Sequence, residues 1–250
     1  MYHHIRQSIF FGLILCLSCT QASYLATHAP WELIFQKKVY GGAAELVGTE
    51  LNAPSFSLYA NGRVIYYRYV DGKRKMAVSD LSREEFLELL TAISDKLTPT
   101  DTTVILDESS EAPVTEYYFY GRRIRIKGLG LSSSHNAFEK FNDSIDRIHF
   151  EKNRNYIPEK IILYVKRLPT GDIGNWPEWK IPDIDLDKIY KKEISFYEPN
   201  SNENSLVIEG KWVKPVQDFA EQTGVYKKCV LNKKIYAVGY RPVLPGQSIE

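Results

Sequence analysis

The chain has 250 residues, of which 44% are hydrophobic and 25% are charged. This length and composition predict a packed core in one large or two small domains. The 32 basic and 31 acidic side chains nearly cancel. A chain without a strong net charge has no global field to draw it onto nucleic acid or anionic lipid, so any such binding must be local.

An export signal is predicted at the start of the chain. An apolar run from Ile9 to Leu17 follows a short segment that carries Arg6 and no acid. The run is too short to span a bilayer, which takes about 20 helical residues, and small residues follow it. We therefore expect the mature chain to be exported to the cell envelope.

Two cleavage sites fit this signal. Ser18 before Cys19 suits the signal peptidase that lipidates bacterial proteins, so residues 1–18 become the signal peptide and Cys19 is acylated. The alternative is ordinary cleavage after Ala22, which makes the signal 1–22. We favour Cys19, because the small residue Ser18 stands directly before it. Its acyl chains would then exceed the two anchors that stable membrane attachment requires. The alternative predicts a periplasmic or secreted protein.

Cysteine usage is sparse. Cys229 is the one cysteine left in the body of the chain once the signal is removed and Cys19 is acylated. A lone cysteine forms no internal disulfide, so the fold must depend on its core. Cys229 lies in a predicted strand, where a buried packing role is expected.

A tether over residues 19–30 leads into a main domain over residues 31–168. The Asn61-Gly62 pair predicts a tight hairpin, and Ser82 with Glu85 predicts a capping box at the start of a helix. A loop follows this helix. A second hairpin is expected to turn at Gly121-Arg122, and a second helix to cover about 136–152.

The C-terminal part begins with a connector rich in proline and tryptophan over residues 169–190. Residues 191–250 then predict a smaller α+β portion that packs on the main domain, with strands at 194–197, 206–208, 229–231 and 235–240. The predicted fold class is α+β. It has mostly antiparallel sheets built from hairpins, two main amphipathic helices and a short third helix.

Several short segments resemble a group of exported bacterial proteins of unknown function, many of them described as lipoproteins. They are Phe56–Ile65 with its Asn61-Gly62 turn, Trp176-Pro177, and the close from Tyr240 to Gly246. The resemblance spans most of the mature chain. It implies export and a coherent fold, and it implies no chemical mechanism.

Motifs that would carry chemistry are incomplete. Gly128-x-Gly130-x-x-Ser133 lacks the third glycine of a dinucleotide fingerprint, and Ser134 stands where a nucleophile elbow needs glycine. The acidic run Asp183–Asp187 begins like a calcium loop but lacks the glycine and the bidentate glutamate. We therefore expect no catalytic residues, no cofactor and no metal site, with loose calcium binding as a minor alternative.

The candidate functional surface is a stripe of cations, Arg123, Arg125 and Lys127. They alternate with Ile124 and Ile126 and must share one face of a strand. Three clustered cations can meet an anionic envelope component such as a phospholipid or lipopolysaccharide headgroup. The alternative is an edge strand that its charges protect from aggregation.

The sequence as a whole favours a lipid-anchored, non-catalytic binding or interaction module of the envelope that does not bind nucleic acid. The alternative is a secreted hydrolase that acts on envelope polymers through a carboxylate pair. A deep pocket with two carboxylates about 5–9 Å apart would favour the enzyme. A shallow surface with an apolar or basic patch would favour the binding module.

Overall fold

The structure, a computed structural model, describes residues 29, 31–40, 54–71, 73–109, 112–129, 137–169, 174–191, 204–221 and 227–247. The predicted signal peptide, Cys19 and nearly all of the tether lie outside these residues, and so does the strand expected at 194–197. The described chain is mostly antiparallel sheet with few helices, in keeping with the α+β class.

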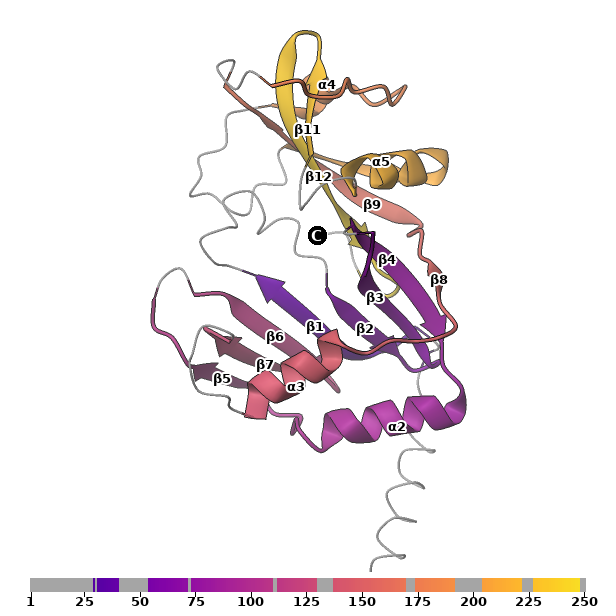
Figure 1. Cartoon of the computed structure of the whole chain (residues 1–250), viewed down its shortest axis with the longest axis vertical. Coiled ribbons are helices and arrows are strands. Elements are labelled where there is room, and N and C mark those ends of the chain that lie inside the picture. Colours follow the sequence, from indigo (N-terminus) through magenta and orange to yellow (C-terminus); the bar gives the residue numbers. More distant parts are fainter. Residues whose placement is uncertain are drawn as a thin grey trace, which may run out of the picture.

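Eight strands form the larger sheet, in the order β5-β7-β6-β1-β2-β3-β4-β8 (Figure 1). Neighbouring strands are antiparallel except for β5 and β7, which run parallel. The bounds are β1 Leu33–Tyr40, β2 Phe56–Tyr59, β3 Arg63–Val70, β4 Lys73–Asp80, β5 Thr102–Ile105, β6 Val114–Phe119, β7 Arg122–Lys127 and β8 Arg154–Asn155.

The smaller sheet has four antiparallel strands in the order β10-β9-β12-β11. The strand bounds are β9 Lys160–Arg167, β10 Ser205–Glu209, β11 Lys227–Leu231 and β12 Lys234–Val243. Residues 160–167 fall within the main domain of the sequence-based division, yet β9 pairs with β10 and β12. This pairing is long-range, so the local pattern that predicted a buried strand could not tell which sheet receives it.

Helices cover one face of the larger sheet. Helix α2, Arg83–Ser94, begins with the predicted capping box, in which Ser82 and Glu85 each accept a backbone N–H. Helix α3, Ala137–Asp146, lies over β1, β6 and β7 (Figure 1). Their buried residues join the main hydrophobic core with apolar side chains from the sheet, among them Phe35, Phe56, Tyr117 and Ile126.

The smaller sheet has its own core. Helices α4, Leu186–Ile189, and α5, Val213–Ala220, pack on it with the 3-10 turn η2, Gly210–Trp212. Trp179 of the connector is 4% exposed, donates its indole N–H to the carbonyl of Ile184 and meets Phe219 edge to face. The described part of the connector thus packs against this core.

The two sheets meet through the end of β12. Leu244, directly after this strand, is buried against Tyr59, Ile65, Met76 and Val78, on the face of the larger sheet that α2 and α3 leave uncovered. This contact places the residue that follows β12 against the second face of the larger sheet.

Two local predictions need correction. The second hairpin turns at Tyr120-Gly121, with positive φ angles of 47° and 80°, and β7 already begins at Arg122. Helix α3 ends at Asp146, so Ile148 packs on the core from the segment after the helix. The Asn61-Gly62 hairpin is confirmed, with Gly62 at a φ of 78° and the Asn61 side chain accepting the N–H of Arg63.

Candidate functional site

Strand β7 carries the predicted stripe of cations. Ile124 and Ile126 are buried in the main core, while Arg123 and Arg125 are exposed and Lys127 is half-buried. The alternation of a strand therefore turns the three cations away from the helices. However, β7 lies between β5 and β6, so the alternative that its charges protect an edge of the sheet is wrong.

The three cations differ in their partners. Arg125 donates Nε to a carboxylate oxygen of Glu116 at 2.7 Å, and this hydrogen bond and the charge of Glu116 raise the arginine's pKa. The Lys127 ammonium is 3.4 Å from the carbonyl of Glu108. The Arg123 guanidinium has no hydrogen bond or ion pair within the described chain, although its backbone N–H donates to Asp101.

Two further cations lie near this stripe. The sheet register sets Lys38 of β1 beside Glu116 of β6, which in turn faces Arg125 of β7. Burial lowers the pKa of Lys38; Glu116 opposes this shift, whereas the positive charges of Arg241 and Arg123 add to it. We call Lys38, Arg123, Arg125, Lys127 and Arg241 the basic face.

Sequence reasoning missed Lys38 and Arg241. Lys38 stands in the tandem Lys37-Lys38, and alternation requires that the two lysines lie on opposite faces. That signal could have been used, but it does not tell which lysine faces the helices. Arg241 comes from the other sheet, and no local pattern in the sequence connects it with β7.

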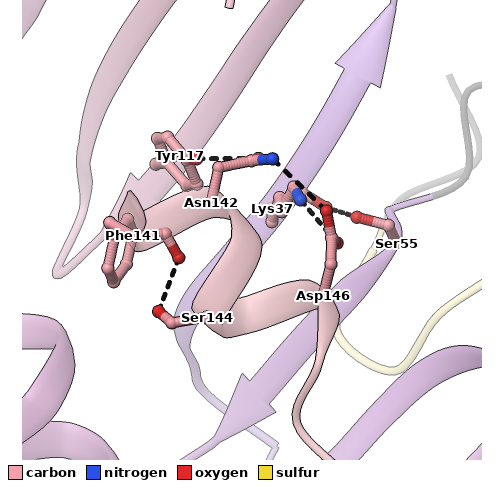
Figure 2. A network of polar contacts seen from close by, with 7 residues as sticks. All are labelled: Lys37, Ser55, Tyr117, Phe141, Asn142, Ser144 and Asp146. Carbon is pink, nitrogen blue, oxygen red and sulfur yellow. Dashed lines mark hydrogen bonds and ion pairs between the residues drawn. The ribbon is translucent and has the colours of Figure 1, made fainter. Parts of the chain in front are cut away.

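Lys37 lies at the centre of a buried polar network beneath α3 (Figure 2). Its side chain is 2% exposed, and its ammonium is 2.6 Å from Asp146, whose carboxylate is 53% exposed. The side chain of Asn142 accepts a hydrogen bond from the Tyr117 hydroxyl and donates one to the carboxylate of Asp146. Burial lowers the pKa of Lys37, and its hydrogen bond to Asp146 opposes this shift. The network binds α3 to β1 and β6, and its buried lysine is out of reach of a substrate.

A second polar network is centred on Asp187 of α4. Its carboxylate accepts hydrogen bonds from Lys234 at 2.6 Å, from Asn232 at 3.1 Å and from the Tyr236 hydroxyl. The bonds from Lys234, Tyr236 and Asn232, in that order, lower the pKa of Asp187 to about 2. The network ties α4 to the β11–β12 hairpin.

The acidic run that resembles a calcium loop is used within the fold. Asp185 caps α4 by accepting a hydrogen bond from the backbone N–H of Asp187. The carboxylate of Asp187 in turn accepts the hydrogen bonds from Lys234, Asn232 and Tyr236. Within the described ranges, no group of three or more His, Cys, Asp or Glu side chains is arranged to hold a metal ion. Asp185 and Asp187 thus have hydrogen-bond partners within the fold.

A groove of about 510 Å³ lies where the N-terminal end of β1 meets the end of β12. Its apolar wall includes Trp31, which is 39% exposed, together with Ile157 and Pro245. Glu159 is the one carboxylate among the groove's lining residues. The groove thus presents a single acid, whereas a glycosidase-type mechanism uses two carboxylates at a set separation.

The glycine motif after β7 has a structural explanation at its first position. Gly128 has a φ of 81°, and a Cβ added there would lie 2.3 Å from the Cβ of Asp107. Only glycine fits this close turn. Gly130, Ser133, Ser134 and His135 lie outside the described residues.

Cys229 is fully buried in the core of the smaller sheet and forms no disulfide. Burial raises the pKa of its thiol to about 12. The predicted packing role is confirmed as far as burial is concerned.

No family model, curated protein or solved structure matches the chain. No helix among the described residues has the length and apolarity needed to cross a membrane.

Proposed function

We propose that the chain is an exported envelope protein, anchored through an acylated Cys19, that acts as a non-catalytic binding module for phosphate-bearing headgroups. The observation that carries this proposal is the basic face. Four of its cations project from β1 and β7, the strands on either side of β6, and Glu116 of β6 pairs with Arg125 and lies beside Lys38. A cluster with this excess of positive charge attracts multivalent anions although the whole chain is nearly neutral.

The arrangement of the layers supports the same function. In this proposal α2 and α3 are the two main amphipathic helices that the sequence predicts, and α5 is the short third helix. Helices α2 and α3 pack on one face of the larger sheet and bury it. The opposite face then divides into an apolar half, covered by Leu244, and a half that carries the basic face. The second half is the one on which the cations of the basic face cluster.

The lipid anchor makes weak binding sufficient. A chain held at a membrane by Cys19 and a tether of residues 19–30 meets headgroups at a high effective concentration, of order millimolar for short flexible linkers. Each exposed cation near an anionic surface adds about 1 kcal/mol, and salt screens this attraction. A small basic patch on an anchored domain can therefore orient the domain on its membrane.

Binding is tested with the full chain carrying Cys19→Ala, so that no acyl group contributes. It should bind vesicles of phosphatidylglycerol but not of phosphatidylcholine, and the binding should weaken as salt rises. Replacing Arg123, Arg125 and Lys127 together with Gln should abolish most of it while thermal unfolding stays unchanged. If the Cys19→Ala chain does not bind phosphatidylglycerol vesicles even at low salt, the proposed function is wrong.

The anchor is tested in cells with a fatty-acid probe. The native chain should be labelled, and the Cys19→Ala chain should not be. Equal labelling of the two, or a mature N-terminus at Ser23, would refute acylation of Cys19.

A further inference from the structure

We infer that the groove beside Trp31 is a saccharide-binding site, in which an uncharged sugar ring packs on the indole and its hydroxyls meet polar side chains of the same groove. These side chains are Arg63, Glu159 and Gln247. The groove volume of about 510 Å³ lies within the range of about 300–1,000 Å³ that is typical of small-molecule sites. The inference goes beyond the proposed function and does not depend on it, because the groove and the basic face share no residue.

The first argument is that one wall of the groove is held in place before any ligand binds. In the turn that follows β12, the backbone N–H of Gln247 donates to the carbonyl of the buried Leu244 at 3.0 Å. Gly246 in this turn has a φ of 76°, and a Cβ added there would lie 3.2 Å from the carbonyl oxygen of Trp31. The turn therefore packs closely against the segment that precedes β1. A site with preformed walls loses little conformational entropy when it binds.

The second argument is the position of the Trp31 indole. The guanidinium carbon of Arg63 lies over this ring, 5.0 Å from its centroid, and the Tyr59 ring meets it edge to face at 5.6 Å. Trp31 nevertheless remains 39% exposed, and the exposed side chain of Ile157 lines the same groove. An exposed indole that its neighbours hold in one orientation offers a flat apolar surface to the C–H groups of a sugar ring.

The third argument is that the cations of the groove have acids of their own. The Arg63 Nε is 2.5 Å from a carboxylate oxygen of Asp80, and the Lys160 ammonium is 2.6 Å from Glu209. Glu159, in contrast, makes no hydrogen bond or ion pair with any residue in the described ranges. An anionic ligand would compete with Asp80 and Glu209 for the cations, and an acyl chain would bury Glu159 without a partner, which is costly. The groove therefore favours an uncharged polar ligand.

The polar groups of the groove match the hydroxyls of a sugar. A hydroxyl can both donate and accept a hydrogen bond, whereas an ionised carboxylate such as that of Glu159 only accepts. The hydrogen bond of Arg63 to Asp80 uses Nε, which leaves the two terminal nitrogens as donors. The side-chain oxygen of Gln247 accepts the backbone N–H of Leu244 at 3.2 Å, which leaves its amide nitrogen as a donor. Neighbouring hydroxyls of one ring can donate to the acid and accept from these donors.

The test titrates the full chain carrying Cys19→Ala with maltotriose, cellotriose and chitotriose, and calorimetry measures the binding. At least one of the three should bind with a Kd of about 1 mM or tighter. Trp31→Ala should weaken this binding about tenfold by removing the stacking surface, and Glu159→Ala about tenfold by removing hydrogen bonds to a charged acceptor. Trp31→Phe, which keeps a smaller ring, should retain part of the affinity.

The chain offers a matched control for each change. Trp176 also has a cation over its ring, with the Lys228 ammonium 4.8 Å from the centroid, but it does not line the groove. Glu178 is a carboxylate of the connector that is 68% exposed and lies outside the groove lining. Trp176→Ala and Glu178→Ala should bind the sugar as the unsubstituted chain does.

The site is supported if Trp31→Ala and Glu159→Ala weaken binding while both controls retain it. The inference is wrong if none of the three sugars binds at about 20 mM, or if Trp176→Ala weakens binding as much as Trp31→Ala does. Binding of decanoate in place of the sugars would assign the groove to an acyl chain and would also refute it. Thermal unfolding shows whether each variant is folded, and the exposed Glu159 still tests the site if Trp31→Ala is not. Vesicle binding by the basic face is a separate measurement, so either proposal can fail without the other.

Discussion

Lys37 and Lys38 are neighbours in sequence, lie on opposite faces of β1 and have opposite surroundings. Lys37 points toward α3, is 2% exposed and has Asp146 at 2.6 Å. Lys38 points to the other face, where Arg123 and Arg241 add to the positive charge around it. Identical side chains one residue apart thus have different surroundings: Lys37 has an acid at hydrogen-bond distance, and Lys38 has none among the described residues.

The difference shows what each face supplies. A buried ammonium loses its hydration, and the fold must provide an acid to offset that loss. On the inner face α3 provides Asp146. On the outer face Glu116 pairs with Arg125, and its charge also acts on Lys38 from the neighbouring strand. The inner lysine should therefore be the more sensitive of the two to the loss of a single acid.

The largest effect is expected from Asp146→Ala. This change leaves the buried Lys37 ammonium without its partner, and the free energy of unfolding should fall by about 2–3 kcal/mol, less than for a fully buried pair because Asp146 is half exposed. Urea unfolding at neutral pH measures it. The control Asp218→Ala removes an exposed carboxylate that pairs with Lys214 on α5, outside the Lys37 network, and should cost less than about 0.5 kcal/mol.

A second replacement sharpens this result. Adding Lys37→Met to Asp146→Ala removes the unpaired charge and fills its space with an apolar side chain, so it should recover most of the lost stability. If the double variant is no more stable than Asp146→Ala alone, the cost has another origin and the comparison of the two faces fails on its inner side.

Asp187→Asn extends the comparison to the smaller sheet. It removes the charge that three donors share, and we expect a loss of about 1–2 kcal/mol at neutral pH. Because the folded-state pKa of Asp187, about 2, lies below its ordinary value of 3.8, its contribution to stability is present above pH 4 and is lost as the pH falls toward 2. Urea unfolding between pH 7 and pH 2 should show a smaller acid loss in the variant. Equal acid losses in both proteins would contradict this assignment.

Replacement of Cys229 measures how much an uncharged interior side chain contributes to stability. Cys229→Ala should destabilise the chain by about 1 kcal/mol, because it removes a single buried sulfur atom. The native thiol should resist a thiol reagent until the chain is denatured, since burial raises its pKa to about 12. Rapid labelling of the native protein would place Cys229 outside the packed core.

The smallest effect, and the one of opposite sign, is expected from Lys38→Gln. Because burial disfavours the charged ammonium of Lys38 and lowers its pKa, its replacement by Gln should raise the stability of the chain by a few tenths of a kcal/mol. Thermal unfolding at neutral pH measures it. A loss of stability would mean that Lys38 has a partner within the fold, which would remove the contrast with Lys37.

Local patterns were sufficient where a few adjacent residues determine the structure. Asn61-Gly62 predicts its hairpin because both positions tolerate the backbone of a tight turn, and Ser82 with Glu85 predicts the start of α2 because each satisfies a backbone donor of the other. The alternation of Arg123, Ile124, Arg125 and Ile126 likewise predicted which side chains lie outward. Strand β5, which the sequence suggested as loop, was missed because it has only four residues within a polar segment and is held by parallel pairing with β7.

The sequence by itself determined the alternation within β7, the turn at Asn61-Gly62, the cap of α2 and the burial of Cys229, because each depends on neighbours in the chain. Tertiary structure alone decided that β9 belongs to the smaller sheet, that β7 is an interior strand and that Lys37 pairs with Asp146. The reason is physical. Strand pairing and charge pairing join residues that are far apart in sequence, and their partners are chosen by packing of the whole chain.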